Sequence, residues 1–409
     1  MNKRIIVTGA GAAGLMAAGK AAERGLEVVL LEKNDRAGKK LRISGKGRCN
    51  ITNNTDIEGL IQNIPGNGNF LYSSLYTFSN EDLMYFFKKE GLDLKTERGG
   101  RVFPVSDNAK DVISLLIRYA QKNGVDIRYN SQVESIETKD GAVKGVRLKD
   151  GRLLEAGSVV LATGGASYPG TGSTGDGYRM AKRLGHTITP LKPSLVPLLS
   201  SQKWTSALQG LSLKNITITI LDNKRKKIYT DFGEMLFTHF GVSGPVILSA
   251  SRHIMQYDYR NVYLVIDLKP ALDEETLDAR IQRDFEKYSR KQFKNSLDDL
   301  LPQKLIPVII ELSGIPENKP VNQITKAERK VLAGLLKNLE IEIAGSRPIA
   351  EAIVTAGGVD TDEIDPSTME SKLIKGLFFA GEVIDVDGYT GGFNLTIAFS
   401  TGYSAGASC

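Results

Sequence analysis

Three glycines close to the N-terminus have the spacing of a nucleotide-binding turn. Gly9, Gly11 and Gly14 form the pattern G-x-G-x-x-G. In this pattern the first glycine makes a tight turn, the second admits a pyrophosphate, and the third lets a helix lie close to a strand. Glu32 follows the third glycine by 18 positions and can accept hydrogen bonds from both hydroxyls of a ribose. A carboxylate there repels a 2′-phosphate, so the pattern predicts a dinucleotide other than NADP, without choosing between NAD and FAD.

The neighbouring sequence predicts the elements that must position these residues. Residues 3–8 form a buried-strand run, and a helical pattern continues from there to about residue 24, where Gly25 ends it. Residues 27–32 then form a second strand. This order places free N–H groups, and the positive end of the helix dipole, at the phosphates. An isolated G-x-G-x-x-G is often an ordinary glycine-rich turn, but the complete strand–helix–strand unit strongly favours dinucleotide binding.

Three further stretches favour FAD over NAD. Residues 38–53 (GKKLRISGKGRCNITN) form a glycine-rich basic loop where an NAD enzyme would usually enter another helix. Such a loop suits a large, planar, anionic ligand. Residues 125–165 carry short strands separated by turns and end in ATGG, which is the return path to the first sheet in flavoproteins with two dinucleotide folds. Residues 376–398 form the third stretch.

This third stretch, GLFFAGEVIDVDGYTGGFNLTIA, predicts a strand, an acidic turn and the start of a helix. Glu382 lies just past the strand, at the sheet edge where ligands bind, and can bond a ribityl hydroxyl or a backbone group near the pyrophosphate. Gly391 and Gly392 open the helix, whose N-terminus would stabilise negative charge on the pyrimidine edge of a reduced flavin. A glycine-capped helix packed on a sheet would not require the four glycines and three carboxylates of residues 381–392.

Taken together, these motifs resemble those of one family. The stretches KKLRISGKGRCNITN, ATGGASYPGTGSTGDGYRMA, FTHFGVSGP and VTAGGV…GLFFAGEVIDVDGYTGGFNLTIA are similar to the BaiN, or aminoacetone-oxidase-like, flavoproteins of the YhiN type, in the family's order from Ile5 to Gly406. The resemblance implies noncovalently bound FAD. The cofactor contacts expected from the motifs and the resemblance are Gly9, Gly11, Ala12, Ala13, Gly14, Glu32, Lys33, Lys40, Ser44, Gly45, Gly47, Arg48, Cys49, Asn50, Val133, Thr163, Gly164, Gly165, Gly381, Glu382, Asp387, Gly391, Gly392, Phe393 and Asn394.

Members of this family differ in activity, so the resemblance implies the cofactor more closely than the substrate. It favours NAD(P)H-driven reduction of an activated C=C bond in an enone, such as a 3-oxo steroid or bile-acid intermediate, with hydride passing through flavin N5. The alternative is an FAD-dependent oxidase of an aminoacetone-like amine, with O2 as acceptor and peroxide as product. The single fingerprint would be taken by FAD, so NAD(P)H would dock transiently, whereas an oxidase needs no second nucleotide site. A wide apolar cavity would favour the enone, and a tight site rich in carboxylates would favour the amine.

Two side chains are candidate catalytic residues. His239, in FTHFGVSGP, can exchange a proton near neutral pH, with a structural histidine bonded to backbone as an equal alternative. Tyr389, just before the paired glycines 391 and 392, could protonate an enolate carbon or stack on the substrate, with a packing aromatic as the alternative.

The other candidates are weaker. Tyr168 follows ATGG and is expected to pack in the core rather than to react. His186 and His253 are expected to be structural. Cys49 has no resolving partner nearby in the sequence, so redox catalysis and covalent flavin attachment through it are both disfavoured.

The predicted fold is α/β, with a Rossmann-like FAD domain of the two-dinucleotide-fold type, an inserted β-rich, barrel-like domain and a small helical insert. Alternating patterns indicate the strands of the inserted domain, and charged helical spacing indicates the insert, where Thr325 and Glu328 form a capping box. The expected parts are the FAD domain at 1–190 and 355–409, the β-rich substrate domain at 191–270 and 339–354, and the helical insert at 271–338.

Composition limits the classes of partner. The 53 basic and 47 acidic residues give a net charge of +6, which permits a nucleic-acid partner without demanding one. An RNA-modifying flavoprotein would show a concentrated basic face with exposed aromatic residues, whereas the charges of this sequence are scattered. The one basic run, Lys224–Lys227, is predicted to be a solvated hairpin turn. A small-molecule substrate and no nucleic acid are therefore expected. The oligomeric state stays open.

Cysteine content and hydropathy suggest the compartment. The two cysteines, Cys49 and Cys409, make neither a disulfide framework nor a zinc motif, so no metal is expected and the cytoplasm fits best. No apolar run approaches the ~18 residues of a membrane span, so none is expected.

Overall fold

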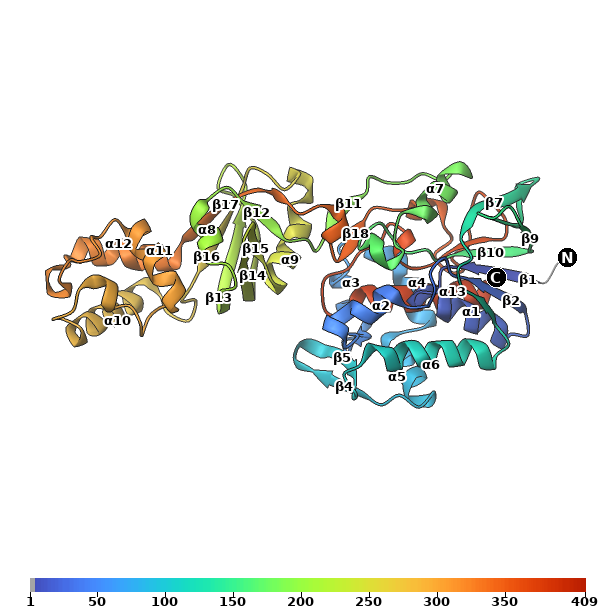
Figure 1. Cartoon of the computed structure of the whole chain (residues 1–409), viewed down its shortest axis with the longest axis horizontal. Helices are drawn as coiled ribbons and strands as arrows, with labels where there is room; N and C mark the ends of the chain where they lie inside the picture. The colour runs from blue at the N-terminus through green and yellow to red at the C-terminus, as the bar shows by residue number, and fades with distance from the viewer. Residues whose placement is uncertain (1–3) are drawn as a thin grey trace. The chain divides into compact units, whose positions relative to one another are not determined.

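The computed structural model describes residues 4–409, and Lys3 of the expected first strand lies outside them. The chain forms two compact units (Figure 1). Unit 1 contains the residues up to Ser194 together with Ile349–Cys409, and unit 2 is the inserted segment Leu195–Pro348. Unit 2 contains both a β-barrel and a helical cluster.

A five-stranded parallel sheet lies at the centre of unit 1. Its strands are β1 (Arg4–Thr8), β2 (Glu27–Leu31), β6 (Asp126–Arg128), β10 (Ser158–Leu161) and β19 (Leu377–Phe379). The spatial order is β19-β10-β1-β2-β6, and every neighbouring pair is parallel. The four strands other than β6 are short runs rich in Ile, Val, Leu and Phe and are almost wholly buried, as a parallel sheet covered on both faces requires. The predicted Rossmann-like α/β class is confirmed.

Three smaller antiparallel sheets complete unit 1. Their strands are β3 (Thr52–Asn53), β4 (Leu94–Glu97), β5 (Arg101–Pro104), β7 (Val133–Lys139), β8 (Ala142–Leu148), β9 (Leu153–Glu155), β11 (Lys192–Ser194) and β18 (Val354–Ala356). They form the sheets β3-β5-β4, β7-β8-β9 and β11-β18, and the last of these lies where the chain leaves and re-enters unit 1. The sequence grouped residues 126–128 with the short strands that follow them in residues 125–165, but β6 instead extends the parallel sheet, where it pairs with the apolar strand β2.

The first and last long helices of the chain, α1 (Ala12–Glu23) and α13 (Phe393–Ser408), pack against each other in unit 1 (Figure 1). Their approach is close because Gly402 and Gly406 of α13 lie on the backbone of α1, where a Cβ would overlap carbonyl oxygens. The other helices of unit 1 are α2 (Lys39–Ile43), α3 (Ile57–Gln62), α4 (Tyr72–Thr77), α5 (Asn80–Lys89), α6 (Ala109–Lys122) and α7 (Asp176–Arg183).

The barrel of unit 2 is closed and has six strands. They are β12 (Leu198–Ser200), β13 (Ser212–Leu221), β14 (Lys227–Thr238), β15 (Gly241–Ser243), β16 (Val262–Asp267) and β17 (Leu339–Ser346), in the order β12-β15-β14-β13-β16-β17. Alternate residues such as Ile218, Phe237 and Leu264 point inward and are fully buried. Aliphatic and aromatic side chains therefore fill the barrel, as is usual for so few strands.

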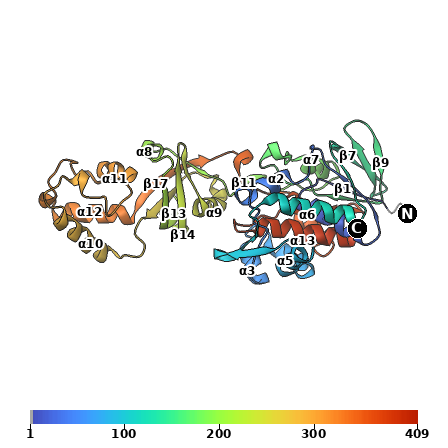
Figure 2. The same cartoon turned by 60° about the horizontal axis from the view of Figure 1, so that its bottom comes forward.

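Five helices accompany the barrel in unit 2. They are α8 (Lys203–Ala207), α9 (Pro245–His253), α10 (Glu274–Lys287), α11 (Ile306–Ser313) and α12 (Lys326–Lys337). Helices α10 to α12 gather at one end of unit 2 (Figure 2), where Arg329 of α12 forms two hydrogen bonds with Asp278 of α10. The predicted capping box of Thr325 and Glu328 begins α12. None of the helices within residues 4–409 is long and apolar enough to cross a membrane.

The barrel core predicts where unit 2 is sensitive to mutation. Phe237 and Phe232 both lie on β14, but Phe237 is 0% exposed and Phe232 is 54% exposed. We expect Phe237→Ala to lower the free energy of unfolding of unit 2 by about 3–5 kcal/mol, and Phe232→Ala to change it by less than about 0.5 kcal/mol. Trp204 is the one tryptophan of the chain and lies beside Phe237, so its fluorescence during urea unfolding reports on unit 2. Equal losses for both variants would contradict this packing.

Candidate flavin site

The fingerprint glycines lie at the carboxyl edge of the parallel sheet, where β1 turns into α1. Gly9 has a φ of 96°, and a Cβ there would lie 2.5 Å from the carbonyl oxygen of Ala162. A Cβ on Gly14 would overlap the carbonyl oxygen of Gly9. For Gly11, in contrast, no described atom beyond its chain neighbours lies within 4 Å of an added Cβ. Gly9 and Gly14 thus permit close packing within the protein, whereas Gly11 faces open space that a ligand can enter. This space lies beside the first turn of α1, which contains Ala12 and Ala13.

Glu32 directly follows β2 at the same edge and is 7% exposed. Its Oε2 accepts a hydrogen bond from the N–H of Ala10 (2.8 Å), and its Oε1 accepts from the backbone N–H of Asn34 (2.8 Å) and from Nδ2 of Asn34 (2.6 Å). A carboxylate has about four acceptor positions. The carboxylate is therefore held in place and still has capacity for a ribose hydroxyl. Sequence analysis missed Asn34, although it lies only two residues after Glu32.

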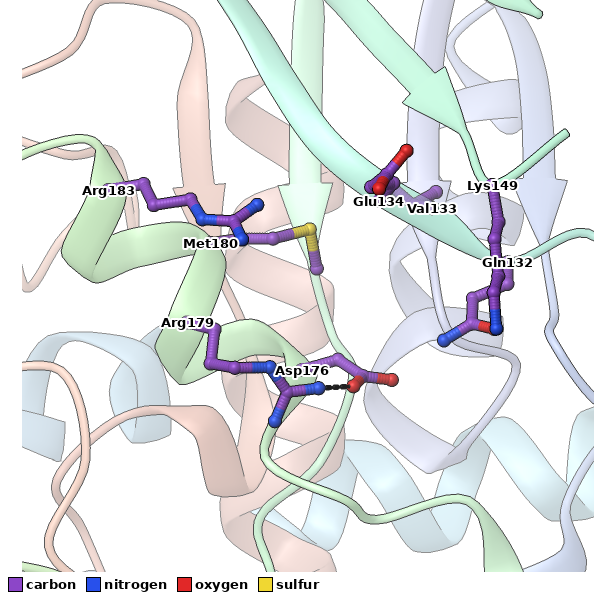
Figure 3. Close-up of a pocket in the computed structure, with 8 residues that line it drawn as sticks. All are labelled: Gln132, Val133, Glu134, Lys149, Asp176, Arg179, Met180 and Arg183. Carbon is purple, nitrogen blue, oxygen red and sulfur yellow. Dashed lines mark hydrogen bonds and ion pairs between the residues drawn. The ribbon is translucent and has the colours of Figure 1, made fainter. Parts of the chain in front are cut away.

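A pocket of about 160 Å³ adjoins this edge (Figure 3). The N–H of Ser131 donates to the carbonyl oxygen of Glu32 (2.9 Å), and the next residue along the chain, Gln132, lines the pocket. The pocket is lined by Gln132, Val133, Glu134, Lys149, Asp176, Arg179, Met180 and Arg183. The expected contact Val133 thus lies beside the Glu32 edge, where the adenosine end of a dinucleotide can fit.

Lys33 is fixed at this pocket by α7. Its Nζ lies 2.6 Å from Oδ2 of Asp176 and donates to the hydroxyl of Thr174 (2.6 Å). Burial raises the pKa of Asp176, but the hydrogen bond and the charge of Lys33 lower it by more, so the pKa lies below the usual value. This carboxylate is therefore charged at neutral pH. Asp176 also pairs with Arg179 (Figure 3). The cation of Lys33 is neutralised within the protein, which leaves its alkyl stem to cover a bound base.

The basic loop of residues 38–53 has a strained backbone. Gly45 and Gly47 have positive φ angles, and so do the non-glycine residues Lys46 (60°) and Cys49 (62°). Such conformations in larger residues are rare and concentrate at ligand sites. Asn50 has a buried Oδ1 for which the described residues provide no hydrogen-bond partner. A bound ligand can supply that partner.

Other side chains of this loop are engaged within the protein. Ser44 donates its hydroxyl to the carbonyl oxygen of Leu41 (2.7 Å). Arg48 pairs with Glu97 and Asp107 and lies over the ring of Phe103. The guanidinium of Arg48 therefore anchors the loop to the sheet that contains β4 and β5. Because that charge is already paired, the backbone of the loop is the part that is available to a cofactor.

Lys40 and Glu382 form an ion pair that joins the loop to the end of β19. The distance from Nζ to Oε2 is 2.6 Å, and Lys40 also donates to the hydroxyl of Ser167 (2.7 Å). The Oε1 of Glu382 accepts from Ser167 (3.1 Å) and from the N–H of Thr355 (2.9 Å). Ser167 and Thr355 were not foreseen, because only the folded chain brings them to Glu382. Gly381, which precedes this carboxylate, has a φ of 74°.

The ATGG segment passes beside this ion pair. Gly164 has a φ of 73°, and a Cβ on Gly165 would lie 2.7 Å from Oε1 of Glu382. The hydroxyl of Thr163 is buried and, like the amide oxygen of Asn50, lacks a hydrogen-bond partner among residues 4–409. Two orphaned polar atoms and the open space at Gly11 together fit a large polar ligand such as FAD.

The N-terminus of α13 is pinned to β3. Gly392 is its N-cap, with a φ of 105°, and a Cβ there would overlap the backbone of Thr52. The hydroxyls of Thr52 and Thr396 lie 2.6 Å apart, and Nδ2 of Asn53 donates to the carbonyl oxygen of Gly391 (3.0 Å). The two glycine-rich stretches that favoured FAD in the sequence therefore meet in space.

The turn before α13 uses its own polar groups. Asn394 accepts from the N–H of Gly388 (2.9 Å) and donates to its carbonyl oxygen (2.6 Å), so its amide shapes the turn. Asp387 is buried and accepts from the hydroxyl of Ser194 (2.8 Å). Phe393 is buried in the core. The backbone N–H groups at the start of α13 are the groups that remain for a ligand.

The candidate catalytic residues lie in different units. His239 is exposed in the turn between β14 and β15 of unit 2, with its ring 4.9 Å from that of Phe240. Tyr389 belongs to unit 1, where its N–H donates to the carbonyl oxygen of Asn63 (2.9 Å). Tyr389 lies three residues before Gly392, the N-cap of α13 in the same unit.

His186 and His253 have structural surroundings, as expected. His186 lies 2.8 Å from the hydroxyl of Ser371 and against the ring of Phe379, and burial lowers its pKa. His253 stacks on Tyr229 with the ring centroids 4.1 Å apart. In the described part of the chain no group of three His, Cys, Asp or Glu residues is arranged to hold a metal ion.

The fold and the family match define the class: the protein is an FAD-dependent oxidoreductase with a Rossmann-like cofactor domain. The family described as "HI0933-like protein Rossmann domain" matches residues 3–408, and the chain belongs to this family. The resemblance to BaiN- and YhiN-type flavoproteins is thereby confirmed.

Three curated relatives match almost the full chain. A "3-dehydro-bile acid delta(4,6)-reductase" of Clostridium scindens is 33% identical over 98% of both proteins. A "Ribosomal RNA dihydrouridine synthase" of Haemophilus influenzae is 33% identical over 98% of this chain and 97% of its own. The protein of the same name from Escherichia coli is 30% identical over 98% and 96%. The relatives therefore share a length and a family but differ in named substrate.

Among solved structures, a 3-ketosteroid delta1-dehydrogenase from Sterolibacterium denitrificans, in complex with 1,4-androstadiene-3,17-dione, has a TM-score of 0.54. The match covers 99% of each chain at 14% sequence identity. At this identity the likeness supports the fold alone.

The open space at Gly11 predicts a variant that loses the cofactor but not the fold. In Gly11→Ala the added methyl group meets no described atom within 4 Å, but it occupies the space at the N-terminus of α1. We expect the dissociation constant for FAD to rise at least about tenfold, while the free energy of unfolding of the apoprotein falls by no more than about 1 kcal/mol for the poorer N-cap. Gly170→Ala is the control, because it too meets nothing within 4 Å. Unchanged FAD binding by Gly11→Ala would contradict this site.

The buried Cys49 predicts a noncovalent cofactor and an unreactive thiol. Burial raises the pKa of Cys49 to about 12 and that of Cys409 to about 11. At pH 8 only about one Cys49 side chain in 10,000 is then a thiolate. We expect a thiol reagent to modify neither cysteine quickly until the protein is denatured, and acid precipitation to release the flavin from both wild type and Cys49→Ser. Flavin retained by precipitated wild type alone would indicate a covalent bond to Cys49.

Proposed function

We propose that this protein uses NAD(P)H to reduce a C=C bond that is conjugated with a carbonyl group. The observation that carries the proposal is what the full-length relatives have in common. Reduction of a 3-dehydro bile acid at its 4,6 positions and conversion of uridine to dihydrouridine both saturate such a bond. The two named substrates differ in size and charge, so the bond is the common feature.

Bound FAD would supply the relay that takes hydride from the nicotinamide and passes it to the substrate. The chain would hold this cofactor at three places. The first-turn N–H groups of α1 would hold the pyrophosphate, Glu32 would accept from the ribose, and the N-terminus of α13 would stabilise negative charge on the pyrimidine edge of the ring. The ion pair of Lys40 with Glu382 keeps the loop of residues 38–53 against the sheet.

The protein would also have to move one proton. Hydride addition to the carbon β to the carbonyl leaves an enolate, and a donor must then protonate the α carbon. Tyr389 is our first candidate because it lies in unit 1 close to the start of α13. His239 is the second, because an exposed imidazole can exchange protons with water.

A bulky apolar enone of the 3-oxo steroid or bile-acid type is the first candidate substrate. This candidate is supported by the bile-acid reductase of Clostridium scindens, which matches the full chain, and by the resemblance of the sequence motifs. A hollow of about 660 Å³ near the turn of residues 383–389 has the size of a small-molecule site, and its lining mixes apolar residues such as Ile61 and Phe70 with polar ones such as Asp362 and Lys372. Asn67 ties this hollow to the turn by donating Nδ2 to the carbonyl oxygen of Asp385 (2.7 Å).

A uridine in ribosomal RNA is the second candidate. Two relatives that match the whole chain act on ribosomal RNA by name, so the expectation of no nucleic-acid partner is not confirmed. A uracil ring carries the same chemical group as the enone, because its C5=C6 bond is conjugated with the C4 carbonyl. One flavin crevice can therefore serve either substrate if a different surface holds the remainder of the molecule.

The proposed function predicts a two-stage reaction. Without oxygen, we expect NADH or NADPH to bleach the flavin absorbance of the purified protein, and either a 3-oxo-4-ene steroid or protein-free ribosomal RNA to restore it. Mass spectrometry would then show two added hydrogen atoms in the steroid or in a uridine of the RNA. In Tyr389→Phe the second stage should slow about 100-fold if Tyr389 is the donor, with the bleaching rate unchanged, and His239→Asn tests the second donor in the same way.

Other outcomes separate the alternatives. Flavin that ignores both nucleotides but is bleached by a small amine, with peroxide formed in air, would indicate the amine oxidase instead. Rapid bleaching by NADPH with no product from steroid or RNA would support an NAD(P)H-dependent reductase but reject both candidate substrates.

A further inference from the structure

Basic side chains gather around the C-terminal end of α10 in unit 2. They are Arg283, Lys287, Arg290, Lys291 and Lys294, which we call the α10 basic surface. All five are exposed. Their spacing of three or four residues places Arg283 and Lys287 on one face of α10, and hydrogen-bonded turns continue that face to Lys291.

Most of this charge is uncompensated. Lys287 lies 2.6 Å from Oδ2 of Asp299, and Lys294 lies 3.9 Å from Glu317. Arg283, Arg290 and Lys291 form no ion pair with any residue in the range 4–409. Three of the five cations therefore have no carboxylate partner in this part of the chain, so their charge is available to an anionic partner.

An aromatic ring lies among these cations. The ammonium groups of Lys287 and Lys291 lie 4.8 and 4.3 Å from the centroid of the Tyr288 ring. The hydroxyl of Tyr288 donates to Asp299 (2.6 Å), which fixes the ring. A half-buried tyrosine flanked by two lysines has the composition of surfaces that bind single-stranded nucleic acid, where cations contact phosphates and a ring stacks on a base.

We propose that the α10 basic surface binds the phosphate backbone of RNA. The proposal rests on the second substrate candidate above, because a reductase of a ribosomal uridine must hold RNA well beyond the reacting base. Phosphate contacts supply most of the affinity for RNA and orient it without reading its sequence. The flavin crevice would then need to recognise only the uracil.

A plain solvated face is the competing explanation for exposed charges. Such faces usually mix both signs. From Arg283 to Lys294, however, the chain carries five basic residues and only two acidic ones, Asp284 and Glu286, and Asp284 already pairs with Arg280 (3.7 Å). The basic turn Lys224–Lys227 of the β13–β14 hairpin is different, because its Arg225 is paired with Glu340 and stacked on Tyr263.

This hairpin supplies a matched control. The triple variant R283Q/R290Q/K291Q removes three unpaired charges from the α10 basic surface, and K224Q/K226Q/K227Q removes the same charge from the same unit. Neither variant breaks an ion pair that the structure contains, so both should fold, which circular dichroism and the unfolding of Trp204 would verify.

Binding of a labelled single-stranded RNA of about 20 nucleotides, longer than one typical site, is measured by fluorescence anisotropy over a series of salt concentrations. For R283Q/R290Q/K291Q we expect the dissociation constant to rise at least tenfold, and the slope of log Kd against log salt concentration to fall by roughly 2, about 0.7 for each lost phosphate contact. For K224Q/K226Q/K227Q we expect a change of less than threefold. Tyr288→Leu should weaken binding without changing the slope.

The remaining outcomes overturn the proposal. Equal losses in both triple variants would mean that only net charge matters, and a loss in the hairpin variant alone would place the surface elsewhere. Failure of the wild-type holoenzyme to bind RNA would also reject it. Bleaching of the flavin by NADPH is measured in parallel and does not require RNA, so this failure is distinct from failure of the proposed reductase.

Discussion

The close contact between α1 and α13 is the constraint on which the flavin crevice depends. Two helices can approach this closely only where one of them lacks side chains, and Gly402 and Gly406 meet that condition against the backbone of α1. The contact holds two segments that are almost 400 residues apart in the sequence. Both helices then begin near the carboxyl edge of the same sheet, so two positive dipole ends are available to one polyanionic cofactor.

The crevice is assembled from segments that lie far apart in the sequence and hold one another in place. The loop of residues 38–53 has strained residues at Lys46 and Cys49, which neighbours must hold in place. The ion pair from Lys40 to Glu382 and the hydroxyl contact from Thr52 to Thr396 provide that support from the other end of the chain. A cofactor that contacts all of these segments would add its binding energy to the stability of the folded unit.

The sequence predicted the parts of this protein that depend on local patterns. The fingerprint glycines, Glu32, the capping box of Thr325 and the alternating strands of the barrel all follow from spacing within short windows. Asn34, Ser167 and Thr355 could not be found in this way, because their roles arise from partners distant in the chain or from side-chain orientation. The placement of β6 was missed for the same reason, since its own three residues do not reveal which strand it will pair with. The α10 basic surface could not be defined in this way either, because a count along the chain does not separate paired from unpaired cations.

The pairing of β11 with β18 makes unit 2 an insertion whose two ends meet at Ser194 and Val354. During synthesis the ribosome therefore completes the barrel and its helices before it makes β19 and α13. Domains fold largely as units as they emerge, so unit 2 can reach its final structure while the N-terminal sheet still lacks an edge strand and a covering helix. Unit 1 then stays incomplete until its last segment is made, and during this interval its unpaired sheet edge is exposed to aggregation.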